Sequence, residues 1–454
     1  MYSNLLQNVL YPIVEVKYPK LKSTMNHLKL LEKSQWWTIS ELKRFQFQRL
    51  QSLLTHAYRN IPYYHRTFKT LSLKPSDIKN SSDINKLPVL TKDIIRKNLN
   101  DLIAKNYPRN ALIPSATGGS SGEPMKFFID TDWKAWNMAA ANREWNWAGY
   151  NIGDKMTYLW AAPQDVSHQG KLKVKLFNLL NRTMFLDAFQ LTEKTLDDYI
   201  KILRTFKPKV INSYSSAIYL MAQYMEKKGI SDIRPESILT SCEMLFGYQR
   251  KIIEKNFHCK VFDYYSGRDT SFHAAECREH TGYHMTIENA LTEFLKDNEP
   301  VAYDEFGKII ITDLSNYAMP FIRYEIGDLG KPSDEHCPCG RRLPLMKEIS
   351  GRIRDIITTK DGKYIPGVFF STLFYDEKGT KGIKQYQFIQ KTKDHSILKI
   401  VKGEDFSHKE LDKIIEKIHE QCGDMKIEIE FVESIPPTPS GKYRTTISEV
   451  ENIL

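Results

Sequence analysis

The chain has 454 residues, and at roughly 100–200 residues per domain this length indicates two or three structural units. Hydrophobic residues make up 41% and charged residues 26%, the balance of a globular protein able to bury a sizeable core. No run of about 18 apolar residues occurs, which argues against a membrane-spanning helix.

The formal net charge of +10 is not gathered into one basic tract. Basic residues are scattered through stretches such as KVKLFNLLNR and KGTKGIK, so a solvated surface is the simplest interpretation. Attraction to an anionic substrate, membrane face or partner is the alternative. The first residues lack a basic region and a small-residue cleavage site, and HCPCG contains two of the six cysteines. We therefore expect a reducing, cytosolic location.

In chain order, the predicted elements begin with a helical segment over residues 1 to about 105, which prolines interrupt. From about 110 to 350, short apolar runs such as 307–314 alternate with helical stretches. This alternation predicts an α/β fold, with a large N-terminal domain of mixed sheets and helices over residues 1–354.

The remaining residues, 355–454, are predicted to form a small α+β domain that acts as a mobile lid. Two predicted strands, SILKIVKG and KIEIEFV, flank a segment in which apolar side chains recur at helical spacing. These side chains are Leu411, Ile414, Ile415 and Ile418.

The stretch TGGSSGEP, residues 117–124, is too rich in glycine and serine for a helix or strand interior, so it predicts an exposed loop. It is not a Walker A loop, because no Lys-Ser/Thr pair follows its last glycine. Its glycines let backbone N–H groups turn toward an anion, and its hydroxyls add donors. A phosphate-binding loop and a plain surface turn both fit this stretch.

Three later stretches have chemistry suited to a nucleotide. FDYYSGRD, residues 262–269, offers aromatic rings for a base and a carboxylate for Mg²⁺. RYEIGDLG, 323–330, places Asp328 to accept hydrogen bonds from vicinal hydroxyls. PPTPSGKYR, 436–444, presents Lys442 on a stiff loop as a point charge for a phosphoryl group. Taken singly, a strand-end turn, a capping Asp and an exposed lysine explain them equally well.

The order of these stretches, with Gly351-Arg352 between the last two, resembles the adenylate-forming superfamily of acyl-CoA synthetases and luciferase-like ligases. The chain is most similar to the phenylacetate–CoA ligase branch that includes capsule-biosynthesis adenylating proteins. LLTHAYRNIPYYHRTF and LPVLTKDIIRKN fit that branch, and the resemblance covers residues 45–445. It implies an ATP- and Mg²⁺-dependent ligase that activates a carboxylic acid as an acyl-adenylate, releases pyrophosphate, and then transfers the acyl group.

The resemblance implies a role for each matching position. Asp269 would hold Mg²⁺, Asp328 would bind the ribose, and Arg352 would reach the nucleotide from the domain junction. Lys442 would bridge the substrate carboxylate and the α-phosphate, because the family works by positioning and charge neutralisation. The β- and γ-phosphates would contact Thr117, Gly118, Gly119, Ser120, Ser121 and Gly122. The adenine would be framed by Ser241, Cys242, Glu243, Asp263, Tyr264, Tyr265, Ser266, Gly267 and Arg268.

Four positions depart from the family pattern. Asp269 stands where Glu is usual, and Cys242 and Ser266 stand where glycines are expected. At the hinge, Arg354 replaces a common Asp and is followed by Asp355. These departures put the hinge, the acyl pocket and the turnover in question, although each keeps a usable group.

The cysteines form a second pattern, with Cys277 and His284 in CREHTGYH and Cys337 and Cys339 in CPCG. Three sulfurs and one imidazole make a closed tetrahedral set for a structural zinc, and relatives in the resembling branch are similar here. Buried free thiols are the alternative, with His280, His336 and His273 as competing ligands. Cys259 and Cys422 have no partners in spacing and are expected in the core.

The tryptophan-rich residues 133–150 favour core packing and acyl-pocket lining over base stacking, and no nucleic-acid reader motif is present. Three functions stay open: transfer to CoA, transfer to an amine or hydroxyl of a polysaccharide precursor, and nucleotide binding without turnover. The partners are then a small carboxylic acid and the acceptor, with a homodimer left open. The acyl pocket is suggested to include Trp136, Tyr214, Phe246 and Phe272.

Overall fold

The computed structural model describes residues 19–117, 125–160, 178–188, 191–352, 356–361, 364–374, 382–436 and 444–450. Helices dominate the first hundred of these residues. They are α3 (Pro19–Ser34), α4 (Ile39–Asn60), α5 (Pro62–Thr70) and α6 (Lys92–Lys97), with 3₁₀ turns at Pro75–Asp77, Ser81–Lys86 and Arg109–Ala111.

Local sequence sets the ends of the long helix α4. Thr38 and Glu41 form a capping box, in which each side chain accepts the backbone N–H of the other residue. Pro62 lacks a backbone N–H and is favoured at a first helical position, so α4 ends and α5 begins there.

A twelve-stranded mixed sheet forms the centre, in the order β11-β10-β12-β13-β14-β9-β8-β7-β6-β5-β3-β4. Strands β4, β3, β5, β6 and β7 pair in parallel, and from β7 to β11 the neighbouring strands pair antiparallel. The sheet therefore changes direction at β7. The strands are β3 (Met156–Trp160), β4 (Thr183–Asp187), β5 (Val210–Tyr214), β6 (Ser237–Ser241), β7 (Lys260–Ser266), β8 (His273–Glu276), β9 (Tyr283–Met285), β10 (Ala290–Lys296), β11 (Glu299–Pro300), β12 (Gly307–Asp313), β13 (Tyr324–Ser333) and β14 (Leu345–Arg352).

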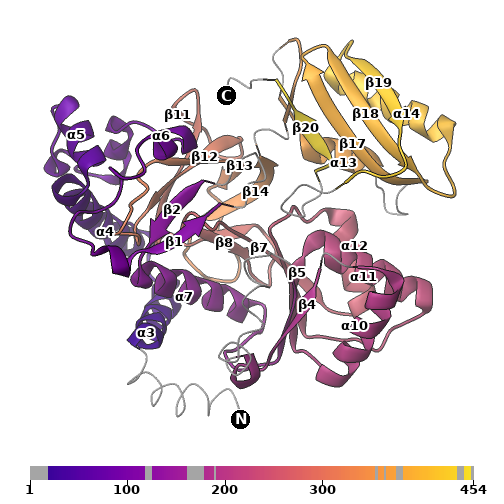
Figure 1. Cartoon of the computed structure of the whole chain (residues 1–454), viewed down its shortest axis with the longest axis horizontal. Coiled ribbons are helices and arrows are strands. Elements are labelled where there is room, and N and C mark those ends of the chain that lie inside the picture. The colour runs from indigo at the N-terminus through magenta and orange to yellow at the C-terminus, as the bar shows by residue number, and fades with distance from the viewer. Residues whose placement is uncertain are drawn as a thin grey trace.

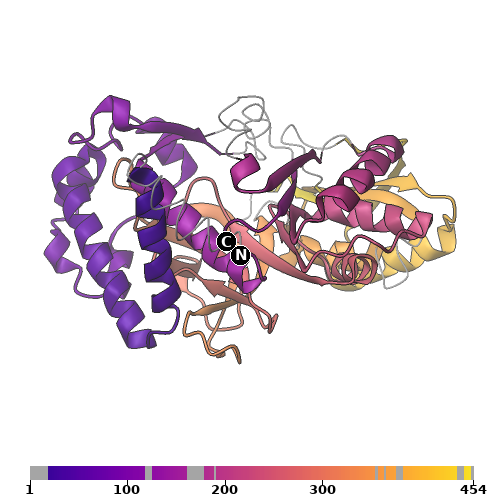
Figure 2. The same cartoon turned by 90° about the horizontal axis from the view of Figure 1, so that it is seen from below.

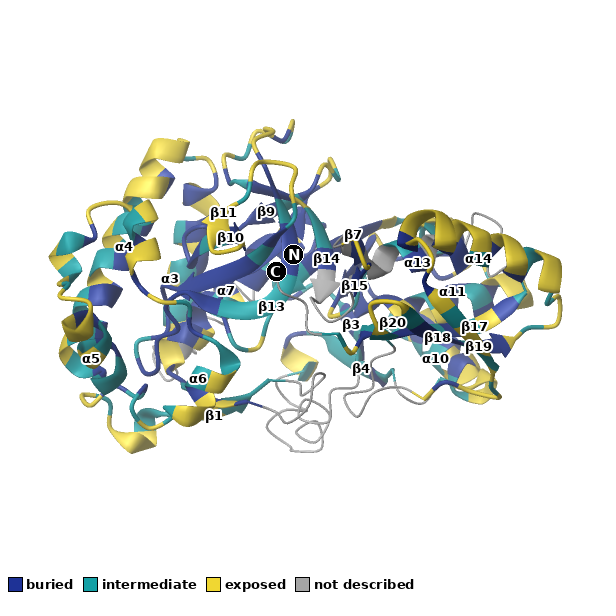
Figure 3. Cartoon of the chain, turned by 90° about the horizontal axis from the view of Figure 1, so that it is seen from above, coloured by how far each residue is buried: buried dark blue, intermediate teal, exposed yellow. Residues whose placement is uncertain are grey.

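Helices cover both faces of the parallel half. On one face α10 (Glu193–Phe206), α11 (Ser215–Lys228) and α12 (Gly247–Phe257) form one hydrophobic cluster with β3 to β7. On the other face α7 (Thr131–Trp147) packs its Ala141 and Trp145 toward Tyr264 of β7. Every residue of β5 and β6 is buried, as expected for parallel strands covered on both sides. Figure 3 shows exposed residues on outer helices such as α5 and α14 and buried residues along the central strands.

The C-terminal residues form a separate α+β unit, as the sequence predicted. Its four-stranded sheet has the order β19-β18-β17-β20, and Leu411, Ile414 and Ile418 of α14 are buried against it. Ile415 at the edge of this face is half-buried. The elements are β15 (Ile356–Thr358), β16 (Tyr364–Pro366), α13 (Gly367–Phe374), β17 (Ile383–Thr392), β18 (His395–Lys402), α14 (His408–Cys422), β19 (Lys426–Phe431) and β20 (Thr446–Ser448).

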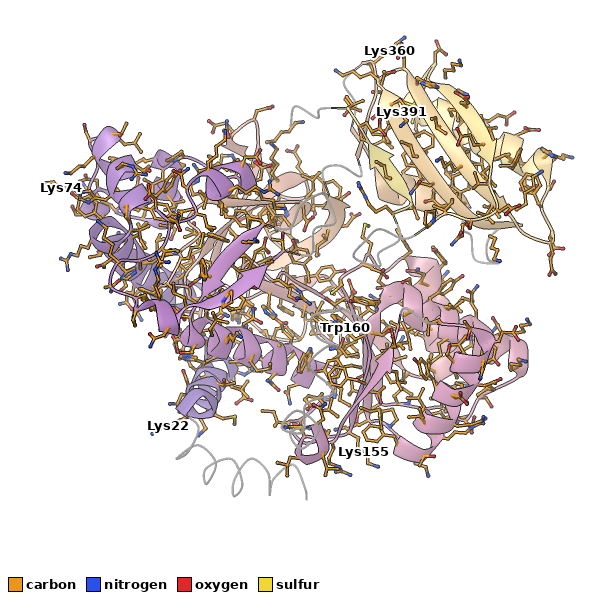
Figure 4. The ribbon with its side chains drawn as sticks, in the orientation of Figure 1. Lys22, Lys74, Lys155, Trp160, Lys360 and Lys391 are labelled. Carbon is orange, nitrogen blue, oxygen red and sulfur yellow. The ribbon has the colours of Figure 1, made fainter. Side chains whose placement is uncertain are left out.

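The C-terminal unit and the N-terminal helices lie at opposite ends of the molecule (Figures 1 and 2). The labelled lysines Lys22, Lys74, Lys155, Lys360 and Lys391 lie far apart around the molecule, which agrees with dispersed basic charge (Figure 4). Among the helices that could be described, none has the length and apolarity needed to span a bilayer.

A buried ion pair joins helices α3 and α7 to the turn between β9 and β10. Arg143 of α7 donates to the Glu288 carboxylate at 2.7 Å and to the Leu31 carbonyl of α3 at 3.1 Å. The two charged side chains are 1% and 0% exposed. Their attraction is therefore unscreened, and removing one partner would leave an uncompensated buried charge.

We predict that Arg143→Met lowers the free energy of unfolding by about 3–5 kcal/mol, measured by urea denaturation. The matched control is Arg204→Met, because Arg204 pairs with Asp232 on the surface and such pairs contribute roughly 0–1 kcal/mol. Equal effects of the two substitutions would contradict the assigned role of the buried pair.

Candidate active site

Two predicted site segments meet where β6 and β7 end. Ser241 is the last residue of β6 and Ser266 the last of β7, and these strands are parallel neighbours. In open α/β sheets, ligands bind beyond the carboxyl ends of the strands, where the strand arrangement changes. The structure therefore brings residues 241–243 and 263–269 together at the edge where a ligand is expected.

The turn after β6 explains one departure from the family pattern. Cys242 has φ of +69°, a left-handed conformation that glycine adopts without strain. Cys242 is exposed to solvent. The next residue, Glu243, accepts a hydrogen bond from the Ser216 backbone N–H at 2.9 Å, at the start of α11. Cys242 thus keeps the turn geometry that a glycine would supply.

Two side chains of β7 are already hydrogen-bonded within the sheet. The Asp263 carboxylate accepts hydrogen bonds from Thr240 at 2.6 Å and Tyr283 at 2.7 Å, and burial raises the pKa of Asp263 to about 7. The Tyr264 hydroxyl donates to Asn212 at 3.2 Å. These contacts leave the backbone of this segment as the part suited to framing a base.

Two of the predicted carboxylates are Asp269, just beyond β7, and Asp328, on β13. Each accepts a hydrogen bond from a tyrosine hydroxyl. The Tyr265 hydroxyl donates to Asp328 Oδ2 at 2.5 Å, and the Tyr324 hydroxyl donates to Asp269 Oδ2 at 2.7 Å. The backbone of Arg352 on β14 pairs with Asp328 in the sheet register. The structure thus gathers the predicted metal-binding acid, ribose-binding acid and junction arginine.

Sequence reasoning assigned no role to Lys92 or Tyr324, which both lie at this site. Lys92 of α6 donates to the Ile326 carbonyl at 3.0 Å. It reaches that position because Leu90, just before α6, forms a parallel bridge with Tyr324 at the start of β13. The stretch LPVLTKDIIRKN, which contains Lys92, was noted in the sequence for its fit to the family. Its contact with β13 becomes visible only in the fold.

The charge balance at Asp269 reflects this neighbourhood. Burial raises the pKa of Asp269, and the nearby Asp328 charge adds to that effect. The hydrogen bond from Tyr324 and the positive charge of Lys92 act in the opposite direction. The site therefore combines two acids with one lysine and two phenols.

The stretch predicted to bind phosphates, residues 117–124, lies between two strands, β1 (Ile113–Ala116) and β2 (Lys126–Ile129), which pair antiparallel. At its base, Thr117 Oγ1 accepts the backbone N–H of Met125 at 3.0 Å. The predicted contacts at Gly118–Gly122 lie outside the described residues, as do Arg354, Asp355 and Lys442.

Of the four residues suggested for the acyl pocket, Phe246 stacks on Tyr248 with ring centroids 5.8 Å apart, and the other three lie in different hydrophobic clusters. Trp136 packs with α3, Tyr214 with the helices on the opposite face, and Phe272 with β10 and β12. Tyr214 stacks on Trp160 with ring centroids 4.4 Å apart, and Figure 4 labels Trp160 in the middle of the molecule. Most of the tryptophan-rich stretch lies in α7, and its Trp133, Trp136, Trp145 and Trp147 are buried, which agrees with the expected core packing.

Cys277, His284, Cys337 and Cys339 converge as the spacing suggested, and their ligand atoms all lie within 4.8 Å of one another. The Sγ atoms of Cys277 and Cys337 are 3.5 Å apart, and Cys339 Sγ lies 3.4 Å from His284 Nε2. Burial lowers the pKa of His284 to about 4, so its imidazole is neutral as a ligand must be.

These distances fit a tetrahedral metal. Zn–S bonds of about 2.3 Å place sulfur atoms roughly 3.7 Å apart around a shared ion. Two competing histidines have other partners: His273 contacts Glu144 at 3.0 Å and His280 contacts Glu276 at 3.2 Å. The donor set therefore suits a closed structural site without an open coordination position.

The chain is similar to a family model, to known proteins and to solved structures. A family model described as the CapK C-terminal domain matches residues 357–449. The chain is 25% identical to Protein CapK of Staphylococcus aureus, across 98% of both lengths. It is 27% identical to phenylacetate-coenzyme A ligase of Escherichia coli (strain K12), covering 72% of this chain and 75% of that one.

Among solved structures, 2-hydroxyisobutyryl-CoA ligase bound to R3-HIB-AMP matches with a TM-score of 0.73 and 20% identity, over 92% of each chain. An open form of that ligase, with 2-HIB-AMP and CoA, gives a TM-score of 0.62. The predicted fold, a large domain of mixed sheets and helices with a small α+β C-terminal domain, is confirmed.

We predict that protein purified without chelator contains about one zinc per chain, measured by elemental analysis. Cys337→Ser should remove it, because one thiolate of the tetrahedral set is lost. Cys259→Ser is the matched control, since Cys259 lies outside the cluster. Less than half an equivalent of zinc in the unaltered protein would contradict the site.

Proposed function

Because the chain is homologous to CapK and to phenylacetate–CoA ligases and has the adenylate-forming fold, we propose that it activates a carboxylic acid as an acyl-adenylate and releases pyrophosphate. The predicted enzyme class, an AMP-forming carboxylate ligase, is confirmed by these relatives. The observation that supports the reaction is the meeting of Asp269, Asp328 and the Arg352 backbone beyond β7.

The proposed roles follow from charge. Ionised Asp328 only accepts hydrogen bonds, which suits it to the two ribose hydroxyls. Asp269 offers a hard oxygen ligand for Mg²⁺, and that ion would neutralise the phosphates. Arg352 would add a fixed positive charge, and the loop beginning at Thr117 would hold the β- and γ-phosphates.

Adenylation brings a negative carboxylate to a negative phosphate, so its barrier is largely electrostatic. One substrate oxygen attacks the α-phosphorus, and pyrophosphate leaves as the bond to the β-phosphate breaks. We propose that Lys442 lies between the two anions at that moment and lowers the barrier by pairing with both. The C-terminal domain carrying Lys442 would then rotate away for the transfer step.

For the acceptor, we propose CoA first, because the phenylacetate ligase relatives are named for it. An amine or hydroxyl of a polysaccharide precursor is the second candidate. It is suggested by the resemblance to capsule-biosynthesis adenylating proteins. The match to Protein CapK covers 98% of this chain, whereas the match to the E. coli ligase covers 72%. Nucleotide binding without turnover is the third, because Asp269 is one methylene shorter than the usual Glu.

The test is pyrophosphate release with ATP, Mg²⁺, hydroxylamine and a panel of aryl, fatty and amino acids. Hydroxylamine intercepts the acyl-adenylate, so the acceptor need not be known. We predict a signal with one acid class, and a loss of about a hundredfold or more in Lys442→Ala, because a developing charge loses its partner.

Transfer from a supplied acyl-adenylate should survive in Lys442→Ala. Lys391→Ala is the matched control, since Lys391 lies on the same C-terminal unit and pairs with Glu449. Equal loss of both half-reactions would count against the role of Lys442. Silence across the panel with ATP still bound would favour the non-catalytic candidate.

A further inference from the structure

The two carboxylates of the site are held by a reciprocal pair of tyrosines. Tyr265 lies four residues before Asp269, and Tyr324 lies four residues before Asp328. Each phenol donates to the acid of the other segment: Tyr265 to Asp328 at 2.5 Å and Tyr324 to Asp269 at 2.7 Å. We call these two hydrogen bonds the crossed clasp.

The clasp joins segments that the sheet itself does not join. Strands β8, β9 and β14 lie between β7 and β13 in the strand order. The end of β7 and the start of β13 therefore share no backbone hydrogen bonds. The two side-chain hydrogen bonds cross this gap and connect the segments that carry Asp269 and Asp328.

Packing fixes the two phenol rings. Tyr324 is fully buried, and its ring lies 5.0 Å from that of Phe321. Tyr265 lies with its ring 6.0 Å from that of Phe272. A ring held by its neighbours presents its hydroxyl in one place, so the carboxylate that accepts it is placed as well.

Each carboxylate commits one oxygen to the clasp. On both acids the phenol takes Oδ2. Asp269 Oδ1 faces Gly267, where an added Cβ would come within 2.8 Å of it. A glycine at this position therefore keeps the approach to Oδ1 clear.

We propose that Tyr265 and Tyr324 are positioning residues, which set the separation of the ribose-binding and metal-binding carboxylates before ATP arrives. Preset spacing means that ATP and its metal ion need not organise two repelling acids on binding. This inference rests on the proposed function, because it assumes that Asp328 and Asp269 contact the nucleotide and Mg²⁺.

The test is the dissociation constant of ATP, measured by calorimetry with Mg²⁺ and again with EDTA. We expect Tyr265→Phe to weaken ATP binding about tenfold in both conditions, because Asp328 loses the hydrogen bond that positions it for the ribose. Tyr324→Phe should weaken ATP binding about tenfold with Mg²⁺ and leave it unchanged in EDTA. The reason is that only Asp269, the proposed metal ligand, loses the hydrogen bond that positions it. A general loss of structure would not produce that split.

Tyr64→Phe is the matched control. Tyr64 is buried in the same cluster as Tyr324, and its hydroxyl bonds the backbone at Pro320 and Ile322. The Tyr64→Phe variant should be less stable than the unaltered protein and should bind ATP with the same affinity. ATP binding unchanged in both Tyr265→Phe and Tyr324→Phe, or weakened equally in Tyr64→Phe, would overturn the clasp.

Asp328→Asn and Asp269→Asn separate the two levels of the argument. If they weaken ATP binding while the tyrosine variants do not, the proposed function stands and the clasp is wrong. If the Asn variants bind ATP as the unaltered protein does, the site assignment fails and the clasp fails with it.

Discussion

Like charges repel most strongly where water is scarce, and Asp269 and Asp328 lie close enough for the charge of one to raise the pKa of the other. Such a pair persists only if nearby groups compensate for the repulsion. Here two phenols and the ammonium of Lys92 supply that compensation, from three separate parts of the chain. Elements α6, β7 and β13 each contribute one of these compensating groups.

The central sheet provides the place where these parts meet. Strand β7 pairs in parallel with β6 and antiparallel with β8, and the connection between β7 and β8, residues 267–272, carries Asp269. Backbone groups there are left for a ligand or for side chains. The bridge between Leu90 and Tyr324 brings the N-terminal helices to the same place, so these helices take part in building the site.

The C-terminal helix, the cysteine cluster and the two acids of the site could be predicted from the sequence. The periodicity of Leu411, Ile414 and Ile418 predicted α14, because a helix that packs on a sheet must bury one stripe. The spacing of the cysteines indicated their convergence, since few ligand types suit a metal. The order of motifs pointed to Asp269 and Asp328.

What the sequence did not reveal depends on contacts between distant segments. Lys92 and Tyr324 carry ordinary side chains in ordinary contexts, and 234 residues separate Lys92 from the carbonyl that it contacts. The acyl-pocket residues were guessed from residue type alone. Trp136, Tyr214 and Phe272 lie in three different hydrophobic cores, because aromatic rings pack wherever a large apolar space exists.

The cysteine cluster has a topological consequence. Cys277 and His284 precede β10, whereas Cys337 and Cys339 follow β13, so a metal on these ligands would tie off a long loop of chain. Asp328 and Tyr324 lie inside that loop, and so does the exposed turn at Tyr303. A protease that cut the chain at Tyr303 would leave two fragments still fastened to each other at both the metal and the sheet, with both acids of the site in place.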